Sequence, residues 1–297
     1  MNKFYKKWFF PLAAPSIILF ILVVGIPFIT GVVYSFTSWR GTYFSGGSFF
    51  GSFVGFDNYV KSFTNENFLS SLVNSVEFTA IMLVTVLVFS LLFALMVSSI
   101  KKGAGLYRSA FFLPNLLGGL ALGYIWSFVF EIIFSQILFN PEGLVNVPIL
   151  TNMLQNHHKA IFAMAIVATW QMAGYMMIIF VTGLNNIPGD LYEAADIDGC
   201  NAFQRFKTIT LPMLMPSFTI VIFMTLANCF KMLDINVALT DGNFNTRLLA
   251  YQILRITRDY SPPDYGQAQA QAVIFFVIIA TVTLLQVSIT KKKEVEM

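Results

Sequence analysis

Long runs without a charged residue dominate the pattern of this 297-residue chain. Six such runs exceed the roughly 20 residues that an α-helix needs to cross about 30 Å of hydrocarbon. Strands of a membrane barrel would be about ten residues long and would alternate apolar with polar positions. Because a backbone in lipid must satisfy its own hydrogen bonds, the pattern predicts spanning helices. The predicted spans are 9–36, 73–99, 109–131, 160–184, 213–231 and 269–290, within one transmembrane domain over 1–297.

Composition supports an all-α integral membrane protein with the lipid bilayer as its solvent. The chain is 57% hydrophobic and only 11% charged, whereas a soluble domain carries roughly a quarter charged residues. Its net charge of +3 is scattered beside the apolar runs, which indicates no nucleic-acid partner. The two cysteines, Cys200 and Cys229, form neither a disulfide framework nor a paired metal motif.

The Lys and Arg residues predict the orientation. With six spans, both termini lie on one side together with the loops near 101–108 and 205–207, and that side holds eleven Lys and Arg residues against seven on the other. The positive-inside rule therefore places both termini in the cytoplasm. The loop 185–212 is then cytoplasmic, and at about 27 residues it is long enough to receive a partner protein.

That loop carries the most specific motif in the chain. It contains Glu193-Ala194-Ala195, then three residues, Gly199, nine residues, Ile209, one residue, and Leu211-Pro212. This spacing resembles the EAA-x3-G-x9-I-x-LP signature of ABC importer permeases. Three further segments resemble the maltose- and glycerol-phosphate-type first permeases, although Asn243 stands where glycine is usual: 53–59 (FVGFDNY), 108–114 (RSAFFLP) and 239–242 (LTDG).

The resemblance implies a type I ABC importer permease whose loop docks on a nucleotide-binding subunit. It assigns Glu193 to a charge contact and Gly199 to the turn, with Ala194 and Ala195 as the packing face. Asp198, Leu211 and Pro212 complete the docking segment. The residues themselves favour two short helices here, because Asp190 can cap the first helix after Pro188 and glycine suits a tight turn. An ordinary capped surface helix is the alternative interpretation.

The energy source must lie on another protein. Gly103-Ala104-Gly105 is followed by neither the lysine nor the hydroxyl of a phosphate-binding loop, so ATP and Mg²⁺ are expected on a partner and no cofactor on this chain. No nucleophile, base and orienting group assemble into a catalytic set, so no enzyme is expected. The resemblance implies a multi-pass protein of the bacterial cell membrane that works with a second homologous permease, two ATPase subunits and an extracytoplasmic solute-binding protein.

Polar residues inside the spans are the candidates for a substrate path, because polar groups in lipid usually face the bundle interior. Hydrogen bonding between helices is the alternative. The Gly119-x3-Gly123 pair indicates close helix packing. The five candidates combine aromatic faces with hydrogen-bonding groups suited to a sugar: Trp170, Gln171, Tyr175, Thr225 and Asn228.

The remaining polar residues predict no metal site. His157 and His158 are an outer-loop pair without a nearby carboxylate or third ligand, so a solvated loop is expected there. Glu77 and Glu131 are close to span ends, where they would anchor the helices at the interface.

Import of a carbohydrate, most simply an oligosaccharide, is the leading functional hypothesis. Glycerol phosphate is the runner-up substrate, although the spans supply no basic groups along the path. A stand-alone secondary transporter would need coupling carboxylates near the bilayer centre, and none is present there. An intramembrane enzyme would need a polar catalytic constellation.

Overall fold

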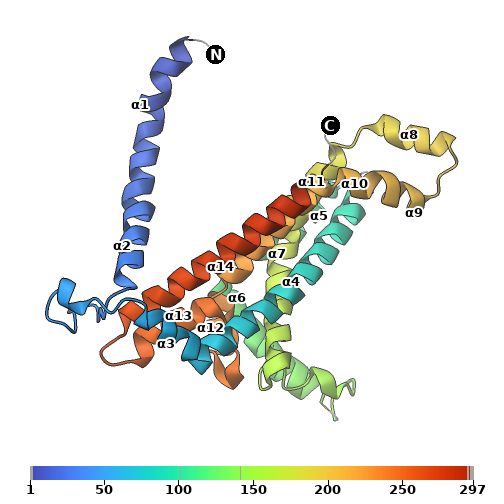
Figure 1. The fold of residues 1–297 in the computed structure, drawn as a ribbon. Helices are drawn as coiled ribbons and strands as arrows, with labels where there is room; N and C mark the ends of the chain where they lie inside the picture. Colours follow the sequence, from blue (N-terminus) through green and yellow to red (C-terminus); the bar gives the residue numbers. More distant parts are fainter. Residues whose placement is uncertain (1–2, 101, 141, 293, 295–297) are drawn as a thin grey trace. The chain divides into compact units, whose positions relative to one another are not determined.

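The computed structural model describes residues 3–100, 102–140, 142–292 and 294, and their architecture is helical (Figure 1). Strand-like pairing in the described part is limited to two isolated bridges, Thr37 with Phe53 and Trp39 with Phe44. This confirms the all-α prediction. The chain forms two compact units: unit 1 comprises Met1–Phe68 with Ile253–Val277, and unit 2 comprises Leu69–Gln252 with Ile278–Met297.

Five helical segments are long and apolar enough to cross a membrane, and a bent pair could supply a sixth. The bent pair, Ala202–Met213 with Met215–Phe230, turns by 65° at its break. The predicted count of six spans therefore depends on whether this pair crosses once, and it stays a prediction. The five segments are Phe9–Tyr34, Glu66–Ser98, Gly119–Leu138, His157–Asn185 and Tyr265–Lys291.

In unit 1 the first span is continuous despite its prolines. It consists of α1 (Lys3–Phe20), a π-helical turn η1 (Ile21–Gly25) and α2 (Ile26–Tyr34). Pro27 has no N–H, and its ring crowds the carbonyl one turn earlier. The π-turn widens the helix just before it, where the Ile26 N–H donates to the Ile21 carbonyl. The chain thus passes Pro27 without breaking.

Asn58 organises the segment that follows the first span. It is the second residue of α3 (Asp57–Thr64) and is buried. Its Nδ2 donates to the carbonyls of Ser35 and Thr37, both at 2.9 Å. The asparagine of the FVGFDNY segment therefore has a structural role, because its two hydrogen bonds hold the loop after α2 closed. In the same unit, Arg40 pairs with Asp264 at 3.0 Å, just before α14 (Tyr265–Lys291).

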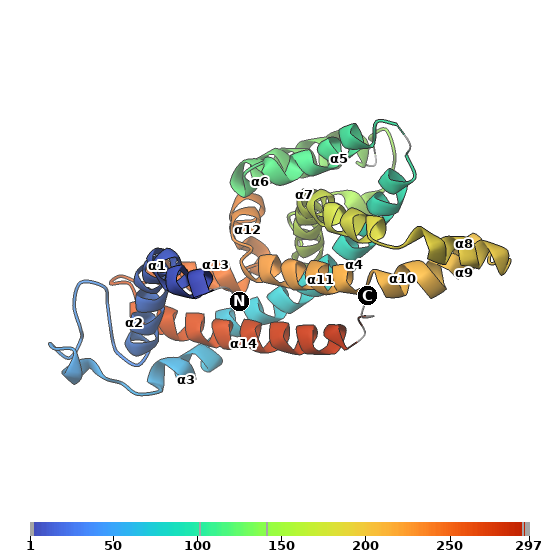
Figure 2. The same cartoon turned by 90° about the horizontal axis from the view of Figure 1, so that it is seen from above.

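Unit 2 is built around α7 (His157–Asn185), the most buried of the apolar helices. It runs beside α4 (Glu66–Ser98) and α11 (Met215–Phe230), as Figures 1 and 2 show. The Thr85 and Thr169 hydroxyls join α4 to α7 at 2.7 Å, and the Ser217 hydroxyl donates to the Ile179 carbonyl to join α11 to α7. Nine of the fifteen buried residues of α7 are alanine or methionine.

The predicted third span, 109–131, is interrupted in the structure. α5 (Ala104–Phe112) passes into a 3₁₀ turn η3 (Leu113–Leu116), and extended backbone at Leu117 and Gly118 separates it from α6 (Gly119–Phe128) and the π-helical η4 (Val129–Leu138). Pro114 in the turn lacks the N–H that would continue the α-helical ladder. The long apolar helix here is Gly119–Leu138.

Two glycine contacts set helix spacing in unit 2. A methyl group on Gly123 would lie 2.5 Å from the Ala238 Cβ, so α6 packs closely against α12 (Asp234–Leu239) through the predicted Gly119-x3-Gly123 face. On α7, a methyl group on Gly174 would overlap the Phe111 carbonyl at the end of α5. Glycine is needed at both places because the neighbour is backbone or a rigid small side chain.

The segment between α12 and α13 (Leu249–Asp259) is held by buried amides. Asn236 donates from Nδ2 to the Thr246 carbonyl at 3.0 Å and accepts the Leu248 N–H at 2.9 Å. From α4, Asn74 donates to the carbonyls of Asn245 and Arg247 at 2.7 and 3.0 Å. The short helices η2 (Phe50–Ser52), η5 (Pro148–Leu150) and η7 (Asn243–Asn245) complete the loops.

Candidate functional site

The loop 185–212 forms a pair of short helices that project from the end of the unit 2 bundle (Figures 1 and 2). α8 (Gly189–Ile197) is followed by a turn at Gly199 and then by α9 (Ala202–Arg205), the π-turn η6 (Phe206–Thr210) and α10 (Leu211–Met213). Gly199 has a φ of +72°, in the left-handed region that glycine adopts without steric cost. The predicted helix-turn-helix is thus present, with its glycine at the turn.

Local hydrogen bonds fix the shape of this pair. Asn201 and Gln204 form a reciprocal capping box at the start of α9. Asp196 at the end of α8 pairs with Arg205 at the end of α9 at 2.6 Å. The predicted cap at Asp190 is wrong: Pro188 holds the N-cap position with no side-chain bond, and Asp190 lies within the first turn. Its carboxylate there still faces the favourable end of the helix dipole.

The segment presents a mixed charged and apolar surface. Glu193, Ala194, Asp198 and Gly199 are exposed, Leu211 and Pro212 are half-buried at α10, and Ala195 is buried within the chain. Ala195 therefore packs inside unit 2, which leaves Ala194 as the small exposed residue of the predicted packing face.

Two exposed apolar residues of the loop were absent from the sequence prediction. Ile197 is 87% exposed and Phe203 is 72% exposed. Ile197 lies four residues after Glu193, so the two share a face of α8. Large apolar residues in an otherwise polar loop were the signal that could have identified this surface.

A polar cleft of about 320 Å³ lies farther along the bundle, between the η3 turn, α7 and α11. Three predicted path residues, Gln171, Tyr175 and Asn228, line it together with Asn115 and four methionines. Gln171 donates from Nε2 to the Leu117 carbonyl at 3.0 Å, and Asn228 donates from Nδ2 to the Met224 carbonyl at 2.8 Å. These bonds to the backbone orient both amides at the cleft.

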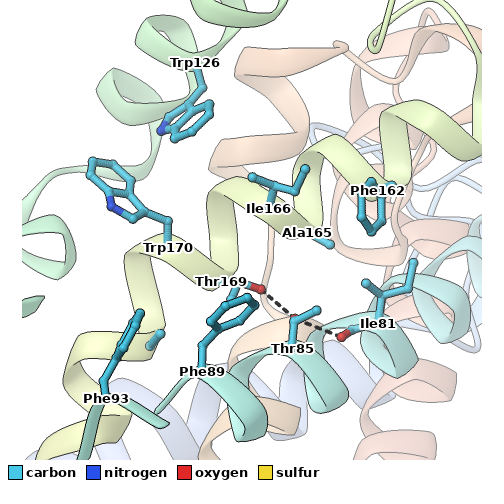
Figure 3. A pocket seen from close by; sticks show the side chains of 11 residues that line it. Ile81, Thr85, Phe89, Phe93, Trp126, Phe162, Ala165, Ile166, Thr169 and Trp170 are labelled. Carbon is cyan, nitrogen blue, oxygen red and sulfur yellow. Dashed lines mark hydrogen bonds between the residues drawn. The ribbon is translucent and has the colours of Figure 1, made fainter. Parts of the chain in front are cut away.

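The other two predicted path residues lie elsewhere. Trp170 lies on a different side of α7, where it stacks edge-on with Trp126 in an apolar pocket of about 430 Å³ (Figure 3). Among the described residues that line that pocket, Thr85 and Thr169 carry hydroxyls, and these bond to each other. Thr225 is fully buried, and among the described residues its hydroxyl has no hydrogen-bond partner. The structure thus brings three of the five candidates together.

The histidine pair lies at the start of α7, far from the projecting loop. Its predicted isolation from any carboxylate is wrong, because α4 brings Glu77 to it across 80 residues of sequence: Glu77 Oε1 is 3.0 Å from His158 Nδ1, and Oε2 is 3.9 Å from His157 Nε2. Glu77 lies within α4, eleven residues after the helix begins. Sequence spacing could not show this, since the contact is between helices.

Comparison with known proteins places the chain among transport permeases. The sequence model described as "Binding-protein-dependent transport system inner membrane component" matches residues 101–294. The probable starch degradation products transport system permease protein AmyD of Thermoanaerobacterium thermosulfurigenes is 36% identical, over 99% of this chain and 98% of that protein. The multiple sugar-binding transport system permease protein MsmF of Streptococcus mutans is 31% identical, over 98% of this chain and 97% of its own length.

Solved structures give the same fold. The chain superposes on a bacterial ABC transporter involved in the import of the acidic polysaccharide alginate with a TM-score of 0.76, at 19% identity, over 98% of both chains. This likeness shows a shared fold, and the five long apolar helices fit a multi-pass membrane protein. On the family match and the identity over its full length, the chain belongs to the binding-protein-dependent transport system inner membrane components.

Proposed function

We propose that the chain is one transmembrane subunit of an ATP-driven importer that carries an oligosaccharide into the cytoplasm. The observation that carries the proposal is the exposed α8–α9 pair, which continues directly from the buried core helix α7 and presents Glu193. Relatives that align over the whole chain are named for starch degradation products and for multiple sugars. The same importer would contain a second homologous permease, two ATPase subunits and an extracytoplasmic solute-binding protein.

The α8–α9 pair is suited to transmit movement from an ATPase. Its exposed face joins the Glu193 carboxylate, which can pair with a cation, to the Ile197 side chain, whose burial at an interface would contribute about 1.5–3 kcal/mol. Only two residues and Pro188 separate α7 from α8, so a displacement of α8 pulls on the core helix. In this proposal ATP and Mg²⁺ bind the partner, and the permease converts subunit closure into alternating access.

A charge reversal tests the docking surface. In co-purification of the chain with the ATPase subunits of its own importer, Glu193→Lys is expected to lower recovery of the ATPase at least about tenfold, since it places like charge against a cationic partner. Glu142→Lys, an exposed reversal in the 139–156 segment, is the matched control. Equal recovery with both variants would contradict docking at Glu193.

The polar cleft is the proposed substrate path. Amides and a tyrosine ring offer hydrogen bonds and an apolar face, which together suit a sugar, and about 320 Å³ lies within the ordinary range of ligand pockets. Gln171→Ala and Asn228→Ala are each expected to lower sugar uptake by up to about tenfold, because each removes one hydrogen-bonding group worth about 0.5–1.5 kcal/mol. Radiolabelled uptake by the reconstituted importer measures this.

The adjacent Trp170 supplies the control for the path. Because it faces the apolar pocket behind α7, Trp170→Phe is expected to leave uptake unchanged. Loss of uptake with Trp170→Phe and normal uptake with Asn228→Ala would reverse the assignment and place the path at the apolar pocket.

Glycerol phosphate is the second candidate substrate. The sn-glycerol-3-phosphate permease UgpA of Yersinia pestis is 28% identical over 81% of this chain. A phosphate would favour cationic side chains, and among the described residues that line the cleft there is no lysine or arginine. Competition of sugar uptake by maltooligosaccharides but not by glycerol phosphate is expected, and the reverse result would select the phosphate.

The chain is also proposed to be non-catalytic by itself. Purified in lipid without partners, it is expected to hydrolyse no ATP and to transport no sugar, because energy input requires the docked ATPase. Solute uptake by the single chain without ATP would instead support a secondary transporter.

A further inference from the structure

Glu77, His157 and His158 form a cluster whose donor atoms converge from two helices of unit 2. One ligand atom from each residue lies within 4.8 Å of both others. Glu77 comes from α4, and the two histidines are the first residues of α7. They are also the only histidines of the chain. Both histidines of the chain therefore lie beside the same carboxylate, that of Glu77.

Simple ion pairing accounts for only part of the geometry. Glu77 Oε1 and His158 Nδ1, at 3.0 Å, are at hydrogen-bond distance. His157 Nε2 is 3.9 Å from Glu77 Oε2, which is too long for a hydrogen bond. The Nδ1 atom of His157 is buried and has no partner in the part of the chain that the structure describes. An ion bound at His157 Nε2 would replace this long contact, and the unpartnered Nδ1 shows that the ring is not fully satisfied within the described residues.

The distances suit a shared metal ion. Zn²⁺ binds histidine nitrogen at about 2.0–2.1 Å and carboxylate oxygen at about 2.0–2.2 Å. In a tetrahedral site, neighbouring ligand atoms are then about 3.4 Å apart. The three donor atoms lie within 4.8 Å of one another, which is wider than that value, so rotations of the three side chains would be needed to bring them into place.

The surroundings allow an ion to enter. The His158 side chain is 76% exposed, which leaves a path from solvent and room for a water molecule as fourth ligand. Lys159, the next residue along the chain, is engaged elsewhere, because its Nζ donates to the Thr151 carbonyl at 3.0 Å. Two imidazoles and one carboxylate are a donor set that zinc sites use.

We propose that Glu77, His157 and His158 bind Zn²⁺ and brace α4 against the start of α7. α7 has 29 residues, so the site lies about 40 Å from the α8–α9 pair at its other end. The site is independent of the docking surface and of the sugar path, and its test does not depend on the proposed function.

The test is metal binding by the full chain in lipid nanodiscs after removal of any affinity tag. Titration with Zn²⁺ against a chromophoric chelator is expected to give one site per chain. Co²⁺ in the same site is expected to show the intense visible absorption of tetrahedral coordination. His158→Asn, at an exposed position that leaves the core intact, is expected to weaken Zn²⁺ binding at least about tenfold, as loss of even an outer-shell partner costs 10–100-fold.

Glu77→Gln is expected to weaken binding as His158→Asn does, while Glu66→Gln removes a carboxylate from the same helix and is expected to bind like the parent. Zn²⁺ should also raise the melting temperature of the parent and of Glu66→Gln only. Failure of the parent to bind Zn²⁺, or parent-like affinity in His158→Asn, would overturn the proposal.

Discussion

Single residues decide how closely the helices of unit 2 approach one another. Gly174 sits where the end of α5 crosses α7, with the Phe111 carbonyl in the space that a Cβ would fill. A backbone atom cannot rotate away as a side chain can, so the contact tolerates only glycine. Asn236 and Asn74 fix local structure through hydrogen bonds instead of small size. Each buried side-chain amide donates to backbone carbonyls that would otherwise have no partner.

Gly174→Ala is expected to destabilise the chain by about 1–3 kcal/mol, because the new methyl forces α5 and α7 apart as overpacking does. Thermal unfolding of the purified chain in detergent measures the effect. Gly105→Ala in α5, where a methyl would meet nothing within 4 Å, is the control and should melt at or slightly above the parent temperature. Equal melting temperatures would show that the helices can shift at no cost.

At the scale of elements, the features that depend on residues close in sequence could be predicted. The helix-turn-helix in 185–212 follows from a proline, a glycine and small residues close in sequence, and the structure has it. The α6–α12 contact follows from the spacing of Gly119 and Gly123. Both signals act over a few residues, so no knowledge of tertiary packing is needed.

Features that depend on contacts between distant elements could not be predicted. Ala195 is buried, although its spacing marks it as part of the exposed motif. Trp170 and Gln171 are neighbours in sequence, yet the 100° step of a helix sends them to different pockets, and only their neighbours decide which pocket is polar. Glu77 reaches the histidines only because α4 and α7 pack side by side.

The turn between α8 and α9 gives a prediction for this pair of helices. Gly199→Val places a β-branched residue at a φ of +72°, which costs about 1–2 kcal/mol in the left-handed region. The turn is exposed, so we expect the melting temperature of the bundle to change little. Stimulation of the ATPase by the loaded binding protein, measured in the assembled importer, is expected to fall because α8 and α9 no longer hold their mutual geometry.

Two substitutions calibrate that result. Gly199→Asn is expected to retain most of the stimulation, since asparagine enters the left-handed region more readily than other side chains. Gly189→Ala, at the start of α8 with open space around it, is expected to behave like the parent. If the importer with Gly199→Val shows normal stimulation of its ATPase, the turn geometry is irrelevant to coupling.

At the scale of the whole molecule, the parity of the spans decides the topology. Five crossings would put the termini on opposite sides of the membrane, and six put them on the same side; the difference is the pair bent by 65°. The excess of Lys and Arg beside the termini favours six crossings with both termini in the cytoplasm. That arrangement also places the α8–α9 pair where an ATPase can reach it.

The two native cysteines provide a direct test of this topology. Cys200 lies in the α8–α9 turn and is partly exposed, whereas Cys229 is buried in α11. A membrane-impermeant maleimide is therefore expected to label the parent chain at Cys200 in inside-out vesicles and not in right-side-out ones. Leu144→Cys in a Cys200→Ser background reports the other side, since Leu144 is 78% exposed, and it should show the opposite pattern.

Epitope tags at the two ends complete the count. With six crossings, protease added to inside-out vesicles is expected to remove both tags, because both termini face the medium together with Cys200. Removal of only one tag would mean an odd number of crossings and would make the bent pair a re-entrant element. Since α11 contributes Asn228 to the polar cleft, that outcome would place the sugar path beside a helix that does not cross the membrane. Labelling of Cys200 from the outside would invert the whole assignment and remove the α8–α9 pair from reach of any ATPase.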